Sequence, residues 1–302
     1  MSKVYTPGYI NLYKTGELNN RIERLYEILK ECKLCPRKCS VDRTKKNSGY
    51  CKSGLDILVS SSGPHFGEEP ELVGDHGSGT IFLTNCNLGC VYCQNYDISH
   101  LGIGKIMSVE ELADTMIGLQ SLGCHNINFV TPTHFVPQLV MSIKKAYEKG
   151  LRIPIVYNCG GYENVEIIKL LNGIIDIYMP DIKYGINEYA KKYSNAENYF
   201  DICKDCVKEM YSQVGDLKSV YGIAQKGLII RHLVLPNNIA GSEKVIKFIA
   251  EEISKDTYIN IMDQYRPCFN ADKYPEINRR INLTEYNKVL ELAKSYGLYR
   301  GF

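Results

Sequence analysis

The sequence lacks tryptophan, a marked excess of either charge and any long apolar run. Its 302 residues carry a formal net charge of +2, which gives no electrostatic basis for a nucleic-acid or membrane partner. No stretch approaches the roughly 20 consecutive apolar residues that span a bilayer. The segment from Met1 to Pro7 has no apolar run behind a basic one, so we expect no secretion signal and a cytoplasmic location.

Cysteine, by contrast, is abundant. Twelve cysteines in a chain without a secretion signal favour metal sites over disulfides, because the cytosol keeps thiols reduced. Seven of the twelve fall into two tight groups. Among the other five we expect Cys124 and Cys159 to be buried and to pack like small apolar side chains.

The first group, C-x2-C-x3-C-x11-C, consists of Cys32, Cys35, Cys39 and Cys51. A helix is expected before it, from about Leu18 to Cys32, because apolar residues recur along one face. Pro36, Gly49 and Gly54 supply the turns that wrapping a metal requires. Four thiolates suit a structural zinc ion or a second iron–sulfur cluster, and the spacing fits both.

The second group, C-x3-C-x2-C, consists of Cys86, Cys90 and Cys93, with Tyr92 before the third cysteine. It follows the apolar run 80–83, which we interpret as a buried strand. Three thiolates can hold three irons of a [4Fe–4S] cluster and leave the fourth iron open for a ligand. Zinc with a distant fourth ligand is the alternative.

Beyond this loop, short apolar strands alternate with amphipathic helices, which predicts an α/β fold with a parallel sheet. With the strand before Cys86 there are six, the other five being 126–130, 153–157, 174–179, 228–235 and 258–262. Helices are predicted at 108–122, 135–149, 163–171, between 187 and 213, at 242–253 and at 284–296. Ser108 and Glu111 form a capping box for the first of these helices. An open doubly wound sheet and a partial barrel both fit this pattern.

Polar residues follow the predicted strands, at the ends where parallel α/β folds collect their chemistry. Asp181 and Lys183 form a charge pair there, and a lysine suits a carboxylate ligand. The candidate cofactor-binding residues are Tyr92, Thr131, Thr133, Asn158, Asp181 and Lys183. The candidates for a catalytic role are His134, Gln264 and Arg266, and for His134 a structural role is equally open.

The cysteine motif with its aromatic Tyr92 resembles the signature of the radical S-adenosylmethionine (SAM) enzymes. That resemblance implies a [4Fe–4S] cluster at the three cysteines, SAM on the open iron, and a 5′-deoxyadenosyl radical from reductive SAM cleavage. It favours a partial (β/α)6 barrel over residues 78–302, behind a metal-binding segment at 1–77. Asp181-Ile182-Lys183 resembles the Asp-x-Lys of glycyl-radical-enzyme activases, whose side chains contact the methionyl part of SAM.

Within that superfamily, the chain is most similar to the group of enzymes like the pyruvate formate-lyase activating enzyme. The segments that carry this likeness are 34–43, 66–70, 77–82 and 262–267. It implies hydrogen abstraction from a protein or peptide, such as a glycyl-radical enzyme, with flavodoxin or ferredoxin as electron donor. One departure is Thr131-Pro132-Thr133, where activases carry a Gly-Gly-Glu type motif that binds the SAM amino group.

Two alternatives stay open from the sequence. The same radical could modify a small molecule or a ribosomal peptide. In a different class of function, both cysteine groups would bind structural zinc and the chain would be an interaction protein.

Overall fold

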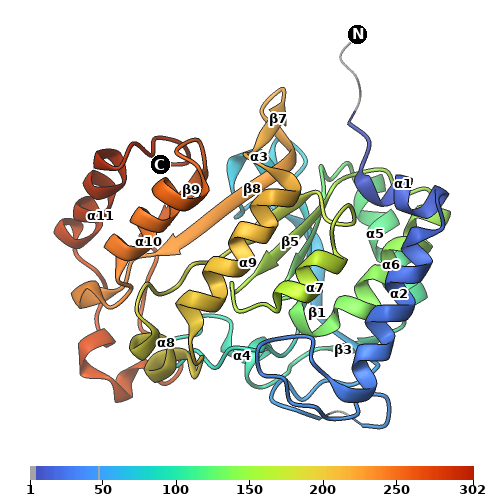
Figure 1. Cartoon of the computed structure of the whole chain (residues 1–302), viewed down its shortest axis with the longest axis horizontal. Coiled ribbons are helices and arrows are strands. Elements are labelled where there is room, and N and C mark those ends of the chain that lie inside the picture. Colours follow the sequence, from blue (N-terminus) through green and yellow to red (C-terminus); the bar gives the residue numbers. More distant parts are fainter. Residues whose placement is uncertain (1–4, 47) are drawn as a thin grey trace.

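The computed structural model describes residues 5–46 and 48–302 (Figure 1). Within these residues one sheet contains the strands β1 (Ile57–His65), β2 (Ser78–Leu83), β3 (Lys105–Met107), β4 (Ile127–Val130), β5 (Ile155–Cys159), β6 (Ile177–Pro180), β7 (Lys218–Val220), β8 (Ile223–Leu233) and β9 (Tyr258–Met262). The helices are α1 (Gly8–Lys14), α2 (Glu17–Glu27), α3 (Pro70–Val73), α4 (Tyr96–Ser99), α5 (Val109–Ser121), α6 (Val136–Glu148), α7 (Val165–Leu170), α8 (Asn187–Ser194), α9 (Tyr199–Val214), α10 (Ser242–Phe248) and α11 (Leu283–Ser295). None of these helices is both long and apolar enough to cross a bilayer.

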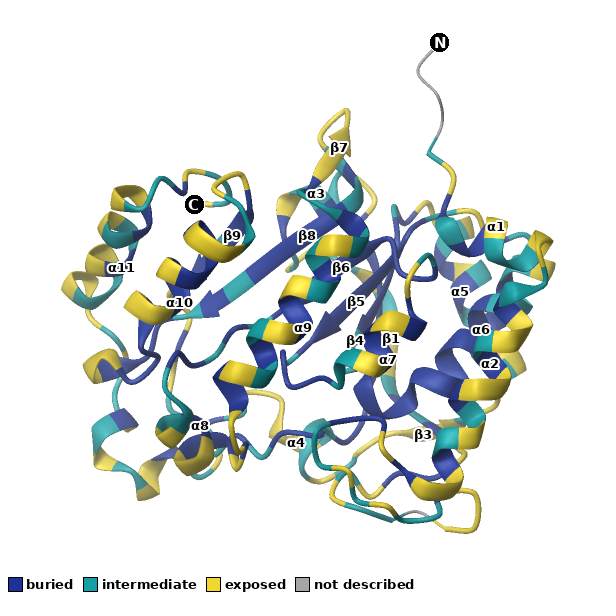
Figure 2. Cartoon of the chain, in the orientation of Figure 1, coloured by how far each residue is buried: buried dark blue, intermediate teal, exposed yellow. Residues whose placement is uncertain are grey.

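The sheet is built around six parallel strands in the order β2-β4-β5-β6-β8-β9. Helices join each strand to the next, and Figure 1 shows them ranged along the outside of the curved sheet. Strands covered on both faces are expected to be buried along their length, and every residue of β5 and β6 is buried. The prediction of a partial (β/α)6 barrel is therefore confirmed, and Figure 2 shows its strands as the buried interior.

The N-terminal part of the chain adds antiparallel strands to one edge of the barrel. β1 pairs antiparallel with β2 and with β3, so the sheet crosses the boundary expected between residues 77 and 78. Helix α2 packs against α6 and α7 on the outer surface. Residues before the barrel therefore contribute β1 to its sheet and α2 to its outer helical layer.

Element ends differ from the predicted ones for local reasons. The strand expected at 153–157 runs from Ile155 to Cys159, because Pro154 has no amide hydrogen for the ladder. The helix expected at 18–32 is α helix only to Glu27 and continues as a 3-10 turn to Glu31. The capping box at Ser108 and Glu111 is present as predicted.

Candidate active site

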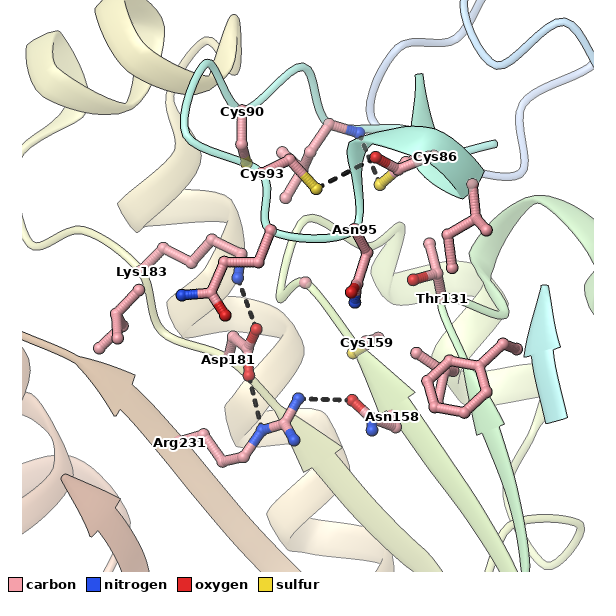
Figure 3. A pocket seen from close by; sticks show the side chains of 18 of the residues that line it. Cys86, Cys90, Cys93, Asn95, Thr131, Asn158, Cys159, Asp181, Lys183 and Arg231 are labelled. Carbon is pink, nitrogen blue, oxygen red and sulfur yellow. Dashed lines mark hydrogen bonds and ion pairs between the residues drawn. The ribbon is translucent and has the colours of Figure 1, made fainter. Parts of the chain in front are cut away.

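A cavity of about 400 Å³ opens where the parallel strands end (Figure 3). This volume is typical of a pocket for a small molecule or cofactor. Its walls are the loop after β2 and the carboxyl-terminal ends of β4, β5, β6, β8 and β9. The strand ends therefore meet around one space, as a parallel α/β fold predicts.

The loop after β2 presents all three cysteines of the second group to this cavity, namely Cys86, Cys90 and Cys93. The backbone N–H of Leu88 donates to Cys86 Sγ over 3.3 Å. On the other side of the loop, Ser194 Oγ donates to Cys90 Sγ over 3.0 Å. Hydrogen bonds of this kind hold sulfur ligands in place and tune an iron–sulfur cluster.

The Cys86 and Cys90 thiols fit a metal cluster better than a nucleophile. Burial raises the pKa of Cys90 to about 11 and raises that of Cys86 further. A thiol with such a pKa is protonated at neutral pH and reacts slowly. A coordinated metal removes that proton outright, and sulfur donors are those that iron–sulfur clusters use.

Opposite the cysteines, Asp181 stands between two cations (Figure 3). Lys183 Nζ donates to Asp181 Oδ2 over 2.5 Å, and Arg231 Nε donates to Asp181 Oδ1 over 2.8 Å. Arg231 Nη2 also donates to Asn158 Oδ1 over 2.7 Å. Burial opposes ionisation of Asp181, but the charges of Arg231 and Lys183 outweigh it and lower the pKa of the carboxyl. The wall is thus a fixed array of charges with one net positive charge.

A second carboxylate reaches this array from the segment after β1. Glu68 Oε2 lies 3.5 Å from Arg231 Nη1, and its Oε1 lies 3.1 Å from His65 Nδ1. Burial raises the pKa of Glu68, while Arg231 acts in the opposite direction. With Glu68 included, the charges of this array sum to zero when His65 is neutral.

Tyr92 supports the loop from the side. Its buried ring contacts Tyr265 edge-on at 5.6 Å between centroids and Tyr184 at 6.5 Å. Aromatic pairs in this geometry add to the packing energy of the buried area. The loop is therefore held against the ends of β6 and β9 by aromatic packing.

The structure brings most of the predicted site residues together. Lining the cavity are Tyr92, Thr131, Asn158, Asp181, Lys183 and Gln264. Arg266 is exposed and does not line it.

Thr133, which we expected at the cavity, points elsewhere, and so does His134, for which a structural role was equally open. The hydroxyl of Thr133 donates to Glu163 Oε1 over 2.7 Å, and His134 Nε2 donates to the Thr84 carbonyl over 2.7 Å. Both side chains are buried. The reason is a 3-10 turn over Thr133–Phe135, which directs these side chains into the protein interior.

Sequence reasoning missed the roles of His65, Glu68 and Arg231. Arg231 had a detectable signal, since it is a charged residue inside an apolar strand and a buried charge requires a partner. His65 and Glu68 had none, because an antiparallel strand brings them to the cavity from outside the βα repeat.

Comparisons with known proteins agree with this geometry. The radical SAM superfamily profile matches residues 80–223, which include the cysteine loop and β4 to β6. Uncharacterized protein MJ0674 of Methanocaldococcus jannaschii is 35% identical over 295 residues, covering 94% of this chain and 80% of that protein. The chain belongs to the radical SAM superfamily. As a radical SAM enzyme, it is not the purely structural zinc protein that the sequence had left open.

Two further proteins are similar to this radical SAM enzyme. Uncharacterized protein MJ0808 of the same organism is 22% identical, over 84% of this chain and 75% of that protein. The crystal structure of HydG, a maturase of the [FeFe]-hydrogenase, aligns with a TM-score of 0.53 at 17% identity. That alignment covers 74% of this chain and 50% of the HydG chain, and it shows a common fold.

Superfamily membership implies a [4Fe–4S] cluster and SAM as the cofactors. The residues present fit both groups, because three sulfur donors and a charged wall face one cavity of suitable size.

Proposed function

We propose that this radical SAM enzyme abstracts a hydrogen atom from a protein or peptide, with a backbone glycine of a glycyl-radical enzyme as the first candidate. Cys86, Cys90 and Cys93 would hold the [4Fe–4S] cluster. When bound there, the cluster and SAM supply one-electron cleavage of SAM to methionine and a 5′-deoxyadenosyl radical. The observation that carries the proposal is the single cavity shared by the three cysteines and the Asp181–Lys183 pair.

In this proposal the charged wall binds the methionyl part of SAM. The charge of Asp181 overrides the effect of burial and raises the pKa of Lys183, so its ammonium stays charged for a carboxylate ligand. Asp181 faces the amino group, while Asn158 and Thr131 offer hydrogen bonds to the ribose. Tyr92 holds the loop that carries the cysteines and supports the adenine side of the cavity.

The substitution Lys183→Met tests this assignment. Losing a hydrogen bond to a charged ligand costs about 1.5 to 3 kcal/mol, so SAM should bind about 10- to 100-fold more weakly. The measurement is equilibrium dialysis of SAM against reconstituted protein without reductant. Lys149→Met is the control, because Lys149 pairs with Asp114 on the surface. Equal affinity of Lys183→Met and the control would remove Lys183 from the SAM site.

Exposed apolar side chains near the cavity favour a protein or peptide over a small metabolite. Leu101 is 62% and Ile103 58% exposed, just after the lining residue His100. Exposed apolar residues that gather beside a site are typical of protein contacts. A small reductant protein such as flavodoxin or ferredoxin is the electron donor in this proposal.

The test is anaerobic incubation of the reconstituted enzyme with SAM, a reductant and a glycyl-radical enzyme. Electron paramagnetic resonance should show a glycyl radical, with one 5′-deoxyadenosine formed per radical. A matched variant with Leu101 and Ile103 changed to serine should lose activation of the partner but keep uncoupled SAM cleavage. If 5′-deoxyadenosine forms without a glycyl radical in any partner, the activase proposal fails while SAM cleavage stands.

A further inference from the structure

The four cysteines of the N-terminal group enclose a second site, separate from the cavity. Lining one small void of about 10 Å³ are Cys32, Cys35, Cys39 and Cys51, together with Arg43 and His134. Cys32 and Cys35 are buried, and Cys39 and Cys51 are partly buried. The backbone N–H of Tyr50 donates to Cys39 Sγ over 3.4 Å, as the Leu88 N–H does to Cys86 in the radical SAM loop.

Arg43 points to an anionic group at this site. It is 1% exposed, and its guanidinium donates to the carbonyls of Ser53 and Gly54. Its third contact is Cys32 Sγ, at 3.8 Å from Nη1. A buried cation requires a negative partner, and a set of metal-bound thiolates provides one.

His134 gives an independent indication of a metal. Its Nε2 faces the Thr84 carbonyl, which can only accept, so in the neutral ring Nδ1 carries the lone pair. This Nδ1 is buried and has no hydrogen-bond partner among residues 5–46 and 48–302. A neutral imidazole nitrogen is a common metal ligand, and here it lines the same void as the four thiols.

The spacing of the four thiol groups distinguishes an iron–sulfur cluster from a single zinc ion. Zinc lies about 2.3 Å from each thiolate sulfur, so a zinc site draws its sulfurs together around one point. Among residues 5–46 and 48–302, no group of three or more cysteine, histidine or acidic side chains is arranged so that it could hold a single metal ion. Cys86, Cys90 and Cys93 also lack an arrangement for a single ion, and these are the cysteines that hold a cluster in the superfamily. The four N-terminal cysteines are included in this statement, and they line one void together.

We propose that Cys32, Cys35, Cys39 and Cys51 bind a second iron–sulfur cluster, with Nδ1 of His134 facing it. This cluster adjoins the radical SAM loop. Arg37 Nε donates to the Asn87 carbonyl over 3.0 Å, and His134 itself bonds the Thr84 carbonyl. In Figure 1 the loop that follows α2 lies at the same end of the sheet as α4.

Iron, sulfide and zinc counts test the proposal. Anaerobically reconstituted wild type should hold about eight irons and eight sulfides per chain, from two clusters of four. A variant with Cys86, Cys90 and Cys93 changed to alanine should keep about four of each, and so should a variant lacking the four N-terminal cysteines. Cys124→Ala is the control, because Cys124 is buried outside both groups.

Wild type with about four irons and one zinc would overturn the proposal, and that count requires no variant to fold. Zinc without iron or sulfide in the variant lacking Cys86, Cys90 and Cys93 would overturn it too. Neither metal count depends on SAM cleavage. A failure of this inference, which rests on the counts, can therefore be distinguished from a failure of the proposed function. His134→Gln, made in that background, should change the spectrum of the remaining cluster, and an unchanged spectrum would remove His134 from the site.

Discussion

At the scale of single residues, Thr131 shows how the cavity wall is built. It follows β4, lines the cavity and holds a left-handed backbone conformation with a φ of 60°. Such a φ is uncommon for a β-branched residue and costs about 1 to 2 kcal/mol. Its N–H donates to the Asn158 carbonyl over 2.8 Å, which fixes the strained backbone against the end of β5.

Replacing Thr131 by glycine should relieve this strain. Thr131→Ala is the matched control, because alanine also lacks the hydroxyl but keeps the Cβ atom that causes the strain. We expect Thr131→Gly to be about 1 kcal/mol more stable than Thr131→Ala in urea unfolding. A glycine variant less stable than the alanine variant would contradict a strained backbone at this position.

Glu163 predicts a pH dependence of stability. This buried carboxyl accepts hydrogen bonds from Thr133 and Tyr157, and burial outweighs both and raises its pKa to about 7. A carboxyl with a raised folded pKa stabilises the fold in its protonated form. Its contribution is complete below the unfolded pKa of 4.5 and is lost as the pH rises through about 7.

Glu163→Gln isolates this effect, since the amide cannot ionise. Between about pH 5.5 and about pH 8, the free energy of unfolding of wild type should fall by about 2 kcal/mol relative to the variant. Chemical denaturation at matched metal content measures the difference. Parallel pH profiles of the two proteins would show that Glu163 does not titrate in this range.

How far the site could be predicted differs from residue to residue. Asn158, Asp181 and Lys183 could be placed at the cavity because parallel strands all end at one edge of the sheet. Thr133 was misplaced, and the role of His134 stayed open, because a 3-10 turn after β4 directs both side chains away from that edge, and a turn of three residues has no periodicity to read. Glu68 depends on pairing between distant segments, which sequence patterns do not record.

At the scale of elements, the long helices and the parallel strands were predictable and the short edge strands were not. The capping box identified the start of α5, and apolar runs identified the six barrel strands. β3 and β7 have three residues each and are largely exposed, so they carry no apolar pattern. Their formation depends on the neighbours β1 and β8.

Ser108→Ala tests the cap of α5. Ser108 Oγ accepts the Glu111 N–H over 3.2 Å, and the Ser108 N–H donates to Glu111 Oε2 over 2.7 Å. Losing the side-chain cap should lower the free energy of unfolding by about 1 kcal/mol in urea titration. Ser121→Ala, at the other end of the same helix, should leave stability within about 0.5 kcal/mol of wild type. Equal losses in both variants would argue against the cap.

At the scale of the whole molecule, one sheet carries both cysteine groups at one end. β1, which follows the four-cysteine segment, pairs with β2, which leads into the radical SAM loop. Sequence patterns located the two cysteine groups. They could not show that the groups lie at the same end of the sheet, because this proximity arises from antiparallel pairing outside the βα repeat. Any change in the N-terminal segment therefore acts on the loop through the sheet edge and the contacts of Arg37 and His134.

The most direct measurement is formation of 5′-deoxyadenosine from SAM by the reconstituted protein under anaerobic conditions with dithionite. Wild type should release 5′-deoxyadenosine and methionine in equal amounts. The variant with Cys86, Cys90 and Cys93 changed to alanine should release neither, and Cys124→Ala should match wild type. Absence of 5′-deoxyadenosine from wild type with an intact cluster and bound SAM would contradict radical SAM chemistry at this cavity.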